Sequence, residues 1–161
     1  MRHHIRRKDK EITDEALLKQ VLTSAQYVTL AMVDDGEPYL VSLSHGYDGE
    51  TGKIYIHSAS EGKKLDVLRK NPKVWGQAML DHGYHKGECS HLYASVMFKG
   101  KVHFIDDAEE KKHAFRVMID QLEPNMEDRD RFAKSTEIPS TVVGYIDVEY
   151  MTGKKSEEVS L

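Results

Sequence analysis

The turns between the first β-type runs of this chain are too short to allow anything but antiparallel strands. Residues 27–33 and 38–47 read as strands separated only by the turn sequence DDGE, and a third run, 53–57, follows the turn DGETG. A parallel crossover needs a dozen or more residues, whereas tight turns join antiparallel neighbours. The three runs therefore predict an antiparallel meander.

Three further runs extend this pattern. We expect strands at 73–80, 92–105 and 141–150, with Gly100 marking a bulge or a bend in the long second run. Antiparallel strands in this number usually close into a barrel, because closure removes unpaired edges. The predicted fold is therefore mainly β with peripheral helices, built on a six-stranded antiparallel barrel.

Helices are expected between the strands. Thr13 can cap a first helix, a second covers about 63–70, and Asp107 and Glu110 have capping-box spacing before a third. Two segments are expected to be irregular: a polar loop at 81–91 and a charged connection at 123–139 with one helical turn near 128–133.

The length of 161 residues suits a single domain over 1–161, with a basic N-terminal segment at about 1–12 and a polar tail at about 152–161. The net charge of −4 and the pI of about 6.1 give no global basic field of the kind that binds nucleic acid. Cys89 is the sole cysteine, which excludes an intramolecular disulfide and fits a reducing cytoplasm. No apolar run approaches the ~20 residues of a membrane span. Neither nucleic acid nor a membrane is therefore an expected partner.

Residues 54–74 combine features that favour an anion. The strand-like run ends at His57, a small polar turn from Ser58 to Gly62 follows, and Lys63 and Lys64 stand at the expected helix start. Unpaired backbone N–H groups and the helix dipole both attract negative charge there. Two lysines at this end of a helix oppose the dipole, and a bound phosphate would explain their presence. The segment therefore predicts a phosphate site.

Four stretches carry a resemblance to a known family. They are GEPY at 36–39 with the strand to residue 48, IYIHSA at 54–59, GKKL at 62–65 through NPKV at 71–74, and YASV at 93–96 leading to Gly100 and Lys101. Together they resemble the FMN-binding split-barrel superfamily of pyridoxamine 5′-phosphate oxidase-like proteins, and within it the 5-nitroimidazole-resistance flavoproteins. The similarity spans roughly residues 6–155. It implies a split β-barrel and a homodimer with FMN at the subunit interface.

The resemblance also implies which residues contact FMN. It assigns the isoalloxazine ring and the ribityl chain to residues 40–45, and the phosphate to the next strand end and the helix start. The implied residues are Leu40, Val41, Ser42, Leu43, Ser44, His45, His57, Ser58, Lys63, Lys64 and Ser95. His57 maps to an active-site histidine of relatives, which makes it the candidate catalytic residue.

The implied function is FMN-dependent reduction of a small-molecule electron acceptor, with a nitroaromatic compound as one candidate. No G-x-G-x-x-G motif marks a dinucleotide domain, so NAD(P)H would bind only transiently. Residues 151–156 read MTGKKS and lack the Arg-and-His substrate motif of pyridoxamine phosphate oxidases. That oxidase activity is therefore not expected. A non-catalytic flavin-binding or stress-related protein is an alternative, because the same phosphate site would serve both.

A metal or haem site is a third hypothesis. His82, His85, Cys89 and His91 form the pattern H-x2-H-x3-C-x-H, and nitrogen and sulfur ligands at such close spacing suit zinc. Glycines within the same segment favour a flexible polar turn instead, so no metal ligand is assigned. No axial-ligand motif selects a histidine for haem.

Overall fold

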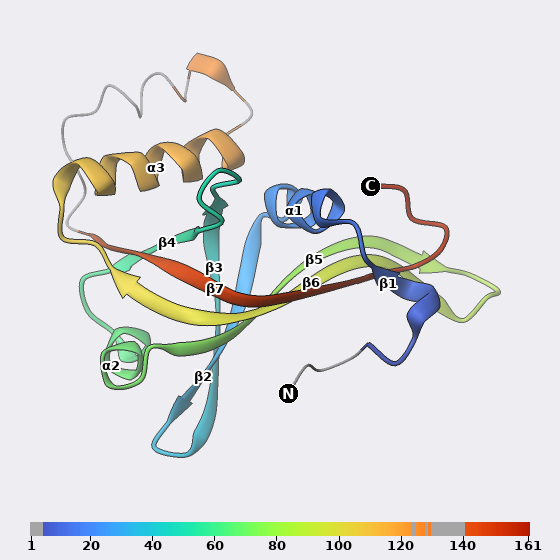
Figure 1. The fold of residues 1–161 in the computed structure, drawn as a ribbon, viewed down its shortest axis with the longest axis horizontal. Helices are drawn as coiled ribbons and strands as arrows, with labels where there is room; N and C mark the ends of the chain where they lie inside the picture. Colours follow the sequence, from blue (N-terminus) through green and yellow to red (C-terminus); the bar gives the residue numbers. More distant parts are fainter. Residues whose placement is uncertain (1–4, 124, 128, 130–140) are drawn as a thin grey trace.

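A computed structural model describes residues 5–123, 125–127, 129 and 141–161 of the chain (Figure 1). The helical turn expected near 128–133 lies outside the described residues apart from Arg129. The elements, in chain order, are η1 Lys8–Lys10, β1 Glu11–Ile12, α1 Glu15–Ser24, β2 Tyr27–Asp34, β3 Glu37–Tyr47, β4 Ile54–Ala59, α2 Lys63–Lys70, β5 Lys73–His85, β6 Ser90–Phe104, α3 Ala108–Leu122 and β7 Thr141–Lys155.

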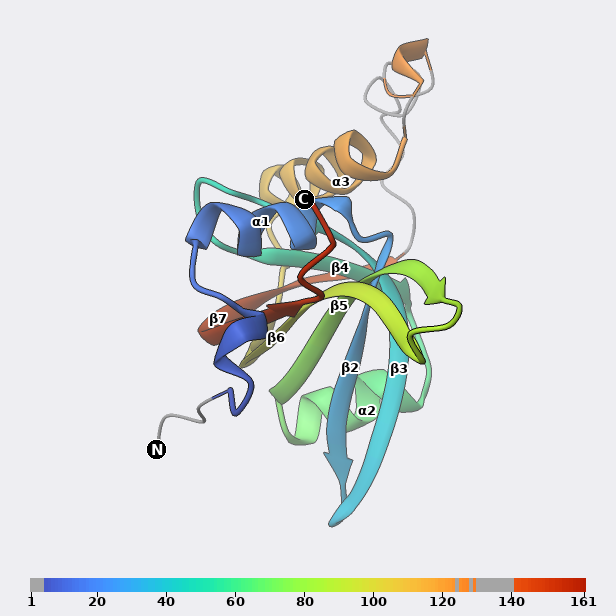
Figure 2. The same cartoon turned by 90° about the vertical axis from the view of Figure 1, so that its right-hand side faces the viewer.

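The strands close into a ring. Their order is β7–β4–β3–β2–β5–β6, and β6 pairs back to β7, with every pairing antiparallel (Figure 2). The predicted fold class, a mainly β antiparallel barrel with peripheral helices, is confirmed. The two-residue strand β1, which the sequence pattern did not predict, pairs with the end of β7.

The β2–β3 hairpin turns on two residues with positive φ. Asp35 has φ +50° and Gly36 has φ +91°, which is the geometry of a type I′ turn, and the Asp-Gly pair is one of its preferred sequences. This tight turn sets Asp34 opposite Glu37. It therefore fixes the position of the acidic hairpin tip relative to the strands.

The ring is incomplete between β3 and β4. Residues 37–44 of β3 pair with β2, but only the last three residues of the strand, from His45 to Tyr47, pair with β4. Among the described residues, no strand pairs with 37–44 on the side away from β2. We call this opening the split; β3 borders it on one side, and the end of β4 with the start of α2 on the other.

The core lies inside the ring. Alternate residues of the strands point inward, and in β2 these are Val28, Leu30 and Met32. The ring of the fully buried Phe98 on β6 packs against Gly76 on β5, where an added Cβ would lie 2.2 Å from the phenyl ring. The contact therefore requires a residue without a side chain at position 76.

Helices α1 and α3 lie toward one end of the barrel and α2 toward the other (Figures 1 and 2). Asp14, and not Thr13 as predicted, caps α1, because its carboxylate accepts a hydrogen bond of 2.8 Å from the Ala16 N–H. Asp107 caps α3 as predicted, by accepting from the Glu110 N–H at 2.8 Å.

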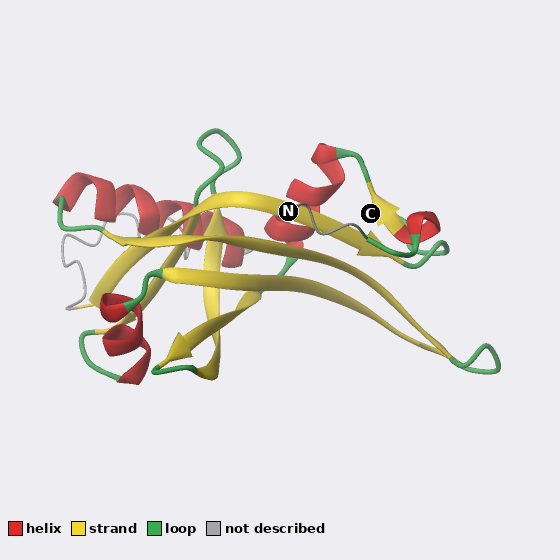
Figure 3. Ribbon diagram, turned by 60° about the horizontal axis from the view of Figure 1, so that its bottom comes forward, coloured by secondary structure: helices red, strands yellow, loops and turns green. Residues whose placement is uncertain are grey.

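The prediction of a polar loop over residues 81–91 is wrong. Strand β5 continues to His85 and β6 begins at Ser90, so the two form a long ribbon that extends beyond the rest of the barrel (Figure 3). The register shifts between Asp81 and Tyr84. Residues 81–85 of β5 are exposed and have no apolar face. They still pair with β6, because the backbone hydrogen bonds of a ladder do not require one. The bulge expected at Gly100 is confirmed by a register shift between Lys99 and Gly100.

Strand β7 is also longer than predicted. It continues through residues 151–155, which pair with the first half of β6. The Ser156 hydroxyl then donates to the His91 carbonyl at 3.0 Å and accepts from the Tyr93 N–H at 3.2 Å. Val159 is buried. The segment expected to be a polar tail is thus docked onto the barrel.

None of the helices in the described residues combines the length and the apolar character required to span a membrane.

Candidate functional site

The split gathers most of the predicted ligand residues. Residues 40–45 lie on β3 at one side of it, and His57, Ser58, Lys63 and Lys64 lie at the end of β4 and the start of α2. Residues 40–44 of β3 form no β-pairs with β4, because the two strands pair only from His45 to Tyr47. The unpaired part of β3 therefore separates two groups of residues that the family resemblance assigns to one ligand.

The start of α2 is open to an anion. Gly62, with φ +136°, stands at the N-cap and supplies no side-chain cap, and an added Cβ there would meet nothing within 4 Å. The Leu65 and Asp66 N–H groups donate to the Gly62 carbonyl at 2.9 and 3.4 Å. The donors left at this helix start are the N–H groups of Lys63 and Lys64, at the positive end of the helix dipole. The Ser58 hydroxyl at the end of β4 is buried and has no hydrogen-bond partner among the described residues. The site therefore offers unsatisfied donors.

The two lysines at this helix start differ in their surroundings. The Lys63 ammonium lies 3.1 Å from the Asp34 carboxylate and 4.9 Å from the centre of the Tyr39 ring. Lys64 is half-buried, and no carboxylate of the described residues lies within ion-pair distance of it. Lys64 is thus the cation that the protein leaves uncompensated here.

His57 lies between the phosphate residues and α3. It pairs with Val143 of β7, and its ring centre is 6.1 Å from that of Phe115 on α3. Burial, and secondarily the positive charge of Lys64, lower the pKa of His57 below its ordinary value. The imidazole is therefore neutral at neutral pH in the free protein, and a neighbouring anion would raise its pKa again.

The residues of β3 divide by face. Leu40, Ser42 and Ser44 point outward, and Leu40 is 63% exposed, whereas Val41 and Leu43 pack against the core. The Ser42 hydroxyl shares a hydrogen bond of 2.9 Å with Thr29. Only the outward side chains and the unpaired backbone edge of this strand face the surroundings of the barrel. Inward Val41 and Leu43 offer their backbone alone.

His45 is placed differently from the other predicted contacts. Its side chain is fully buried, and Nε2 donates to the Leu22 carbonyl at 2.8 Å. Gln121 of α3 donates to the same carbonyl at 3.2 Å and accepts from the Tyr47 N–H at 2.8 Å. The imidazole therefore joins β3 to α1 and α3, and it does not open onto the split.

Ser95 lies away from the phosphate residues. It is nearly buried on β6, where it pairs with Met79 of β5 and Lys154 of β7. Neither of those neighbouring strands borders the split. Within one subunit, Ser95 does not join the residues at 57–64.

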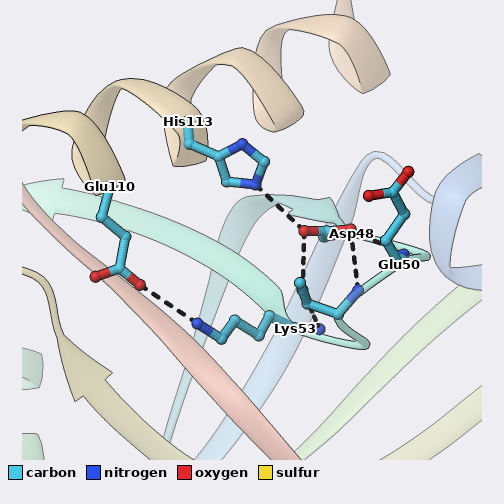
Figure 4. A network of polar contacts seen from close by, with 6 residues as sticks. Asp48, Glu50, Lys53, Glu110 and His113 are labelled. Atoms are coloured by element: carbon cyan, nitrogen blue, oxygen red, sulfur yellow. Dashed lines mark hydrogen bonds and ion pairs between the residues drawn. The ribbon is translucent and has the colours of Figure 1, made fainter.

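Sequence reasoning missed the residues that hold α3 in place (Figure 4). The Asp48 carboxylate accepts from the N–H groups of Glu50 and Thr51, from the Thr51 hydroxyl at 2.8 Å and from His113 of α3 at 3.2 Å. Lys53 contacts Glu110 of α3 at 3.3 Å. Because α3 carries Phe115, this network positions the ring that lies beside His57. The residues of this network are up to 65 positions apart in the chain, so no local pattern predicts their contacts. The turn sequence DGETG marked Asp48 only as a turn residue.

The histidine- and cysteine-containing segment of the metal hypothesis spans residues 82–91. In the described ranges, no group of three or more His, Cys, Asp or Glu side chains is arranged to hold a metal ion. The segment is the tip of the β5–β6 ribbon, where the Tyr84 and His91 rings pack edge to face at 5.1 Å and Cys89 is exposed. His82 and His85 lie on β5, His91 lies on β6, and Cys89 lies in the turn between the two strands.

Comparisons with known proteins identify the family of the chain. The sequence model of the pyridoxamine 5′-phosphate oxidase family matches residues 14–155. The chain therefore belongs to that family. A search of curated proteins found no match.

Several solved structures share the fold. A candidate 5-nitroimidazole antibiotic resistance protein from Bacteroides thetaiotaomicron is 26% identical, with a TM-score of 0.74 and 95% of each chain covered. An FAD-binding protein from Mesorhizobium loti is 24% identical, with a TM-score of 0.64, and 89% of this chain and 96% of that one covered. The FAD- and haem-binding protein from Mycobacterium smegmatis is 19% identical, with a TM-score of 0.74, and 92% and 74% covered.

Proposed function

We propose that this protein is a flavin-dependent oxidoreductase that holds FMN at the split. One observation carries the proposal: an unpaired strand edge, an uncapped helix start and two lysines flank the same opening of the barrel. Family membership and the flavin-binding proteins among the structural neighbours support a flavin over another phosphate ester.

The residues present fit the phosphate of a flavin. The buried Ser58 hydroxyl lacks a partner, the cradle at Gly62 is open, and Lys64 has no carboxylate beside it in the described residues. A phosphate would satisfy all three, since it accepts several hydrogen bonds and carries negative charge. Leu40, Ser42 and Ser44, together with the backbone edge of β3, would flank the ring and the ribityl chain. We assign no ligand contact to the His45 side chain.

A second copy of the chain completes the site in this proposal. The outer face of β2, β3, β5 and β6 exposes five large apolar side chains: Tyr27, Leu40, Trp75, Met79 and Met97. Smaller or polar residues separate them in the strand register, since Leu40 and Trp75 both lie opposite Ala31 and Met97 lies opposite Gln77. We call this surface the outer patch. A group of large exposed apolar side chains on one face suits an interface. The outer patch begins at the edge of the split, so a homodimer formed through it would cover a flavin from both sides and bring the partner's Ser95 toward it.

When bound, the flavin supplies the electron-transfer chemistry. The protein binds and orients it, and the dimer interface excludes water. His57, whose pKa is lowered in the free protein and would rise beside a bound phosphate, would hold or release a proton at Nδ1 or Nε2 for a substrate near the split. The proposed acceptor is small and aromatic, and a nitro compound is the first to test because of the similarity to the Bacteroides protein.

The proposal is tested by titrating the purified protein with FMN, FAD and riboflavin, then assaying turnover. We expect FMN to bind and the complex to reduce a nitroaromatic or a quinone with NAD(P)H or dithionite as donor. Binding of FMN without turnover of any acceptor would leave a non-catalytic flavin-binding protein. Failure of all three flavins to bind would refute the proposal.

The phosphate assignment has its own variant. The double variant Lys63→Ala, Lys64→Ala should bind FMN more weakly by about 3 kcal/mol or more, on the order of a hundredfold in affinity, because two charge-assisted contacts are lost. Riboflavin, which has no phosphate, should be unaffected. Lys86→Ala at the ribbon tip is the matched control, and unchanged FMN affinity in the double variant would refute the assignment.

A further inference from the structure

The lysine that begins α2 already has an anionic partner. The Lys63 ammonium lies 3.1 Å from the Asp34 carboxylate, whose side chain is 23% exposed, and it also lies over the Tyr39 ring at 4.9 Å. Both partners belong to the β2–β3 hairpin, which reaches across to α2 from the strand that borders the split. The hairpin therefore occupies one of the two cations that the phosphate site depends on.

Resting on the proposed flavin function, we propose that Asp34 competes with the bound phosphate for Lys63 and thereby weakens the hold on the cofactor. The Asp34 carboxylate lies 3.1 Å from the Lys63 ammonium. A phosphate bound at the start of α2 would be a second negative charge beside the same cation, and the two anions would repel each other. The phosphate can contact Lys63 only if the Asp34 carboxylate moves away, or if it stays nearby and repels the phosphate. Asp34 is thus a residue that sets cofactor retention without contributing a contact to it.

The hairpin geometry makes this competition persistent. The type I′ turn at Asp35 and Gly36 holds the backbone of Asp34 in register opposite Glu37, which keeps this residue within reach of the helix start. If Lys63 turns to the phosphate, the Asp34 carboxylate, which is only partly exposed, loses its partner. Both effects favour the ligand-free arrangement.

The two lysines consequently have different roles. Lys64 has no carboxylate within ion-pair distance in the described part of the chain, so its charge is available to a phosphate at no electrostatic cost. Lys63 must first leave Asp34. We expect Lys64→Ala to weaken FMN binding more than Lys63→Ala does.

The same hairpin and helix provide a matched control. Asp35 pairs with Lys70 at 3.7 Å, but that contact lies at the opposite end of α2 and both side chains are largely exposed. Asp35→Asn removes a hairpin-to-helix ion pair, as Asp34→Asn does, without changing the charge at the helix start. The two variants therefore separate competition at the phosphate from general loosening of the hairpin.

The experiment is a fluorescence titration of wild type, Asp34→Asn and Asp35→Asn with FMN and with riboflavin. We expect Asp34→Asn to bind FMN roughly three- to tenfold more tightly, the size of one partly screened charge interaction. Riboflavin affinity should not change in either variant, and the FMN gain should shrink at high salt. Asp35→Asn should match wild type.

Unchanged or weaker FMN binding in Asp34→Asn would overturn the inference, and weaker binding would mean that Asp34 holds Lys63 in position for the phosphate. Equal tightening in both Asn variants would also overturn it, because hairpin loosening would then be the cause. Wild-type protein that binds no flavin refutes the proposed function itself, and the inference with it. Thermal unfolding of each variant verifies that the fold is retained.

Discussion

The Nε2 atom of His45 lies 2.8 Å from the backbone carbonyl oxygen of Leu22, in the interior of the protein. The carbonyl only accepts, so Nε2 carries the proton. The other ring nitrogen, Nδ1, is buried and has no partner among the described residues. A protonated ring would bury an unpaired N–H, which makes the neutral form strongly preferred.

Acid should destabilise the fold through His45. Burial lowers its pKa below the ordinary 6.5, and the hydrogen bond to Leu22 offsets this only in part. Because the folded pKa is below the unfolded one, this contribution is fully present above about pH 6.5 and is lost as the pH falls below it, by at most about 1.4 kcal/mol per pH unit. Urea unfolding at several pH values should show the loss for wild type. His45→Gln should flatten the pH slope and exposed His85→Gln should not; equal slopes in all three would contradict the assignment.

Removing the Asp48 charge should loosen α3. Burial alone would raise the pKa of Asp48, but hydrogen bonds from Thr51, Glu50 and His113 together lower it. Asp48→Asn should therefore reduce the free energy of unfolding by about 1–2 kcal/mol at neutral pH. The difference should narrow in acid, because the wild-type contribution is lost as the pH falls through the lowered pKa. Asp106→Asn, at an exposed position, is the control for chemical denaturation.

His57 should report on the phosphate site by NMR. Its pKa should lie below 6.5 in the free protein, since burial and then the charge of Lys64 lower it. Adding FMN should raise that pKa by supplying an anion, and Lys64→Gln should raise it in the free protein by removing a cation. Lys86→Gln should leave the His57 titration unchanged. A His57 pKa indifferent to both FMN and Lys64 would place the phosphate elsewhere.

A charge in the outer patch should prevent dimerisation. Met97, 47% exposed on β6, lies beside Gln77 in the strand register and belongs to the patch. Met97→Asp should yield a monomer by sedimentation and weaken FMN binding, because one wall of the site is lost. Met126→Asp, exposed at 67% and outside the patch, should keep the wild-type mass. A monomeric wild type would contradict the proposed assembly.

Local sequence was enough to predict the elements whose signals are local. Helix α2 has the predicted bounds, Lys63–Lys70, because glycine precedes it and Asn71 and Pro72 follow it. Strand β5 beyond residue 80 was not predictable, since DHGYH has no apolar alternation and is held as a strand by pairing with β6. The end of β7 was missed for the same reason. In that part of the strand Gly153 packs against Leu18 of α1, and an added Cβ would lie 2.3 Å from the Leu18 side chain.

The local arrangement of the candidate phosphate residues could be predicted from the sequence, and their binding of a phosphate stays a prediction. Ser58, Lys63 and Lys64 are close in sequence, and their residue types suit a phosphate at a helix start. The contacts that modify these residues come from distant segments: Asp34 reaches Lys63 through the β2–β3 hairpin, and Phe115 reaches His57 from α3. The burial of His45 was equally invisible, because it depends on Leu22 and Gln121, 23 and 76 residues away.

The strand that closes the barrel, β7, follows in sequence all the strands that it pairs with. Until β7 is synthesised, β4 lacks its neighbour on one side, β6 cannot complete the ring, and β1 has nothing to pair with. The pairings it makes with β4 and β1 join residues about 90 and 140 positions apart, and such long-range contacts are formed late and slowly. A nascent chain would therefore expose open sheet edges on β4 and β6 until β7 has been synthesised, and aggregation must be avoided during that interval.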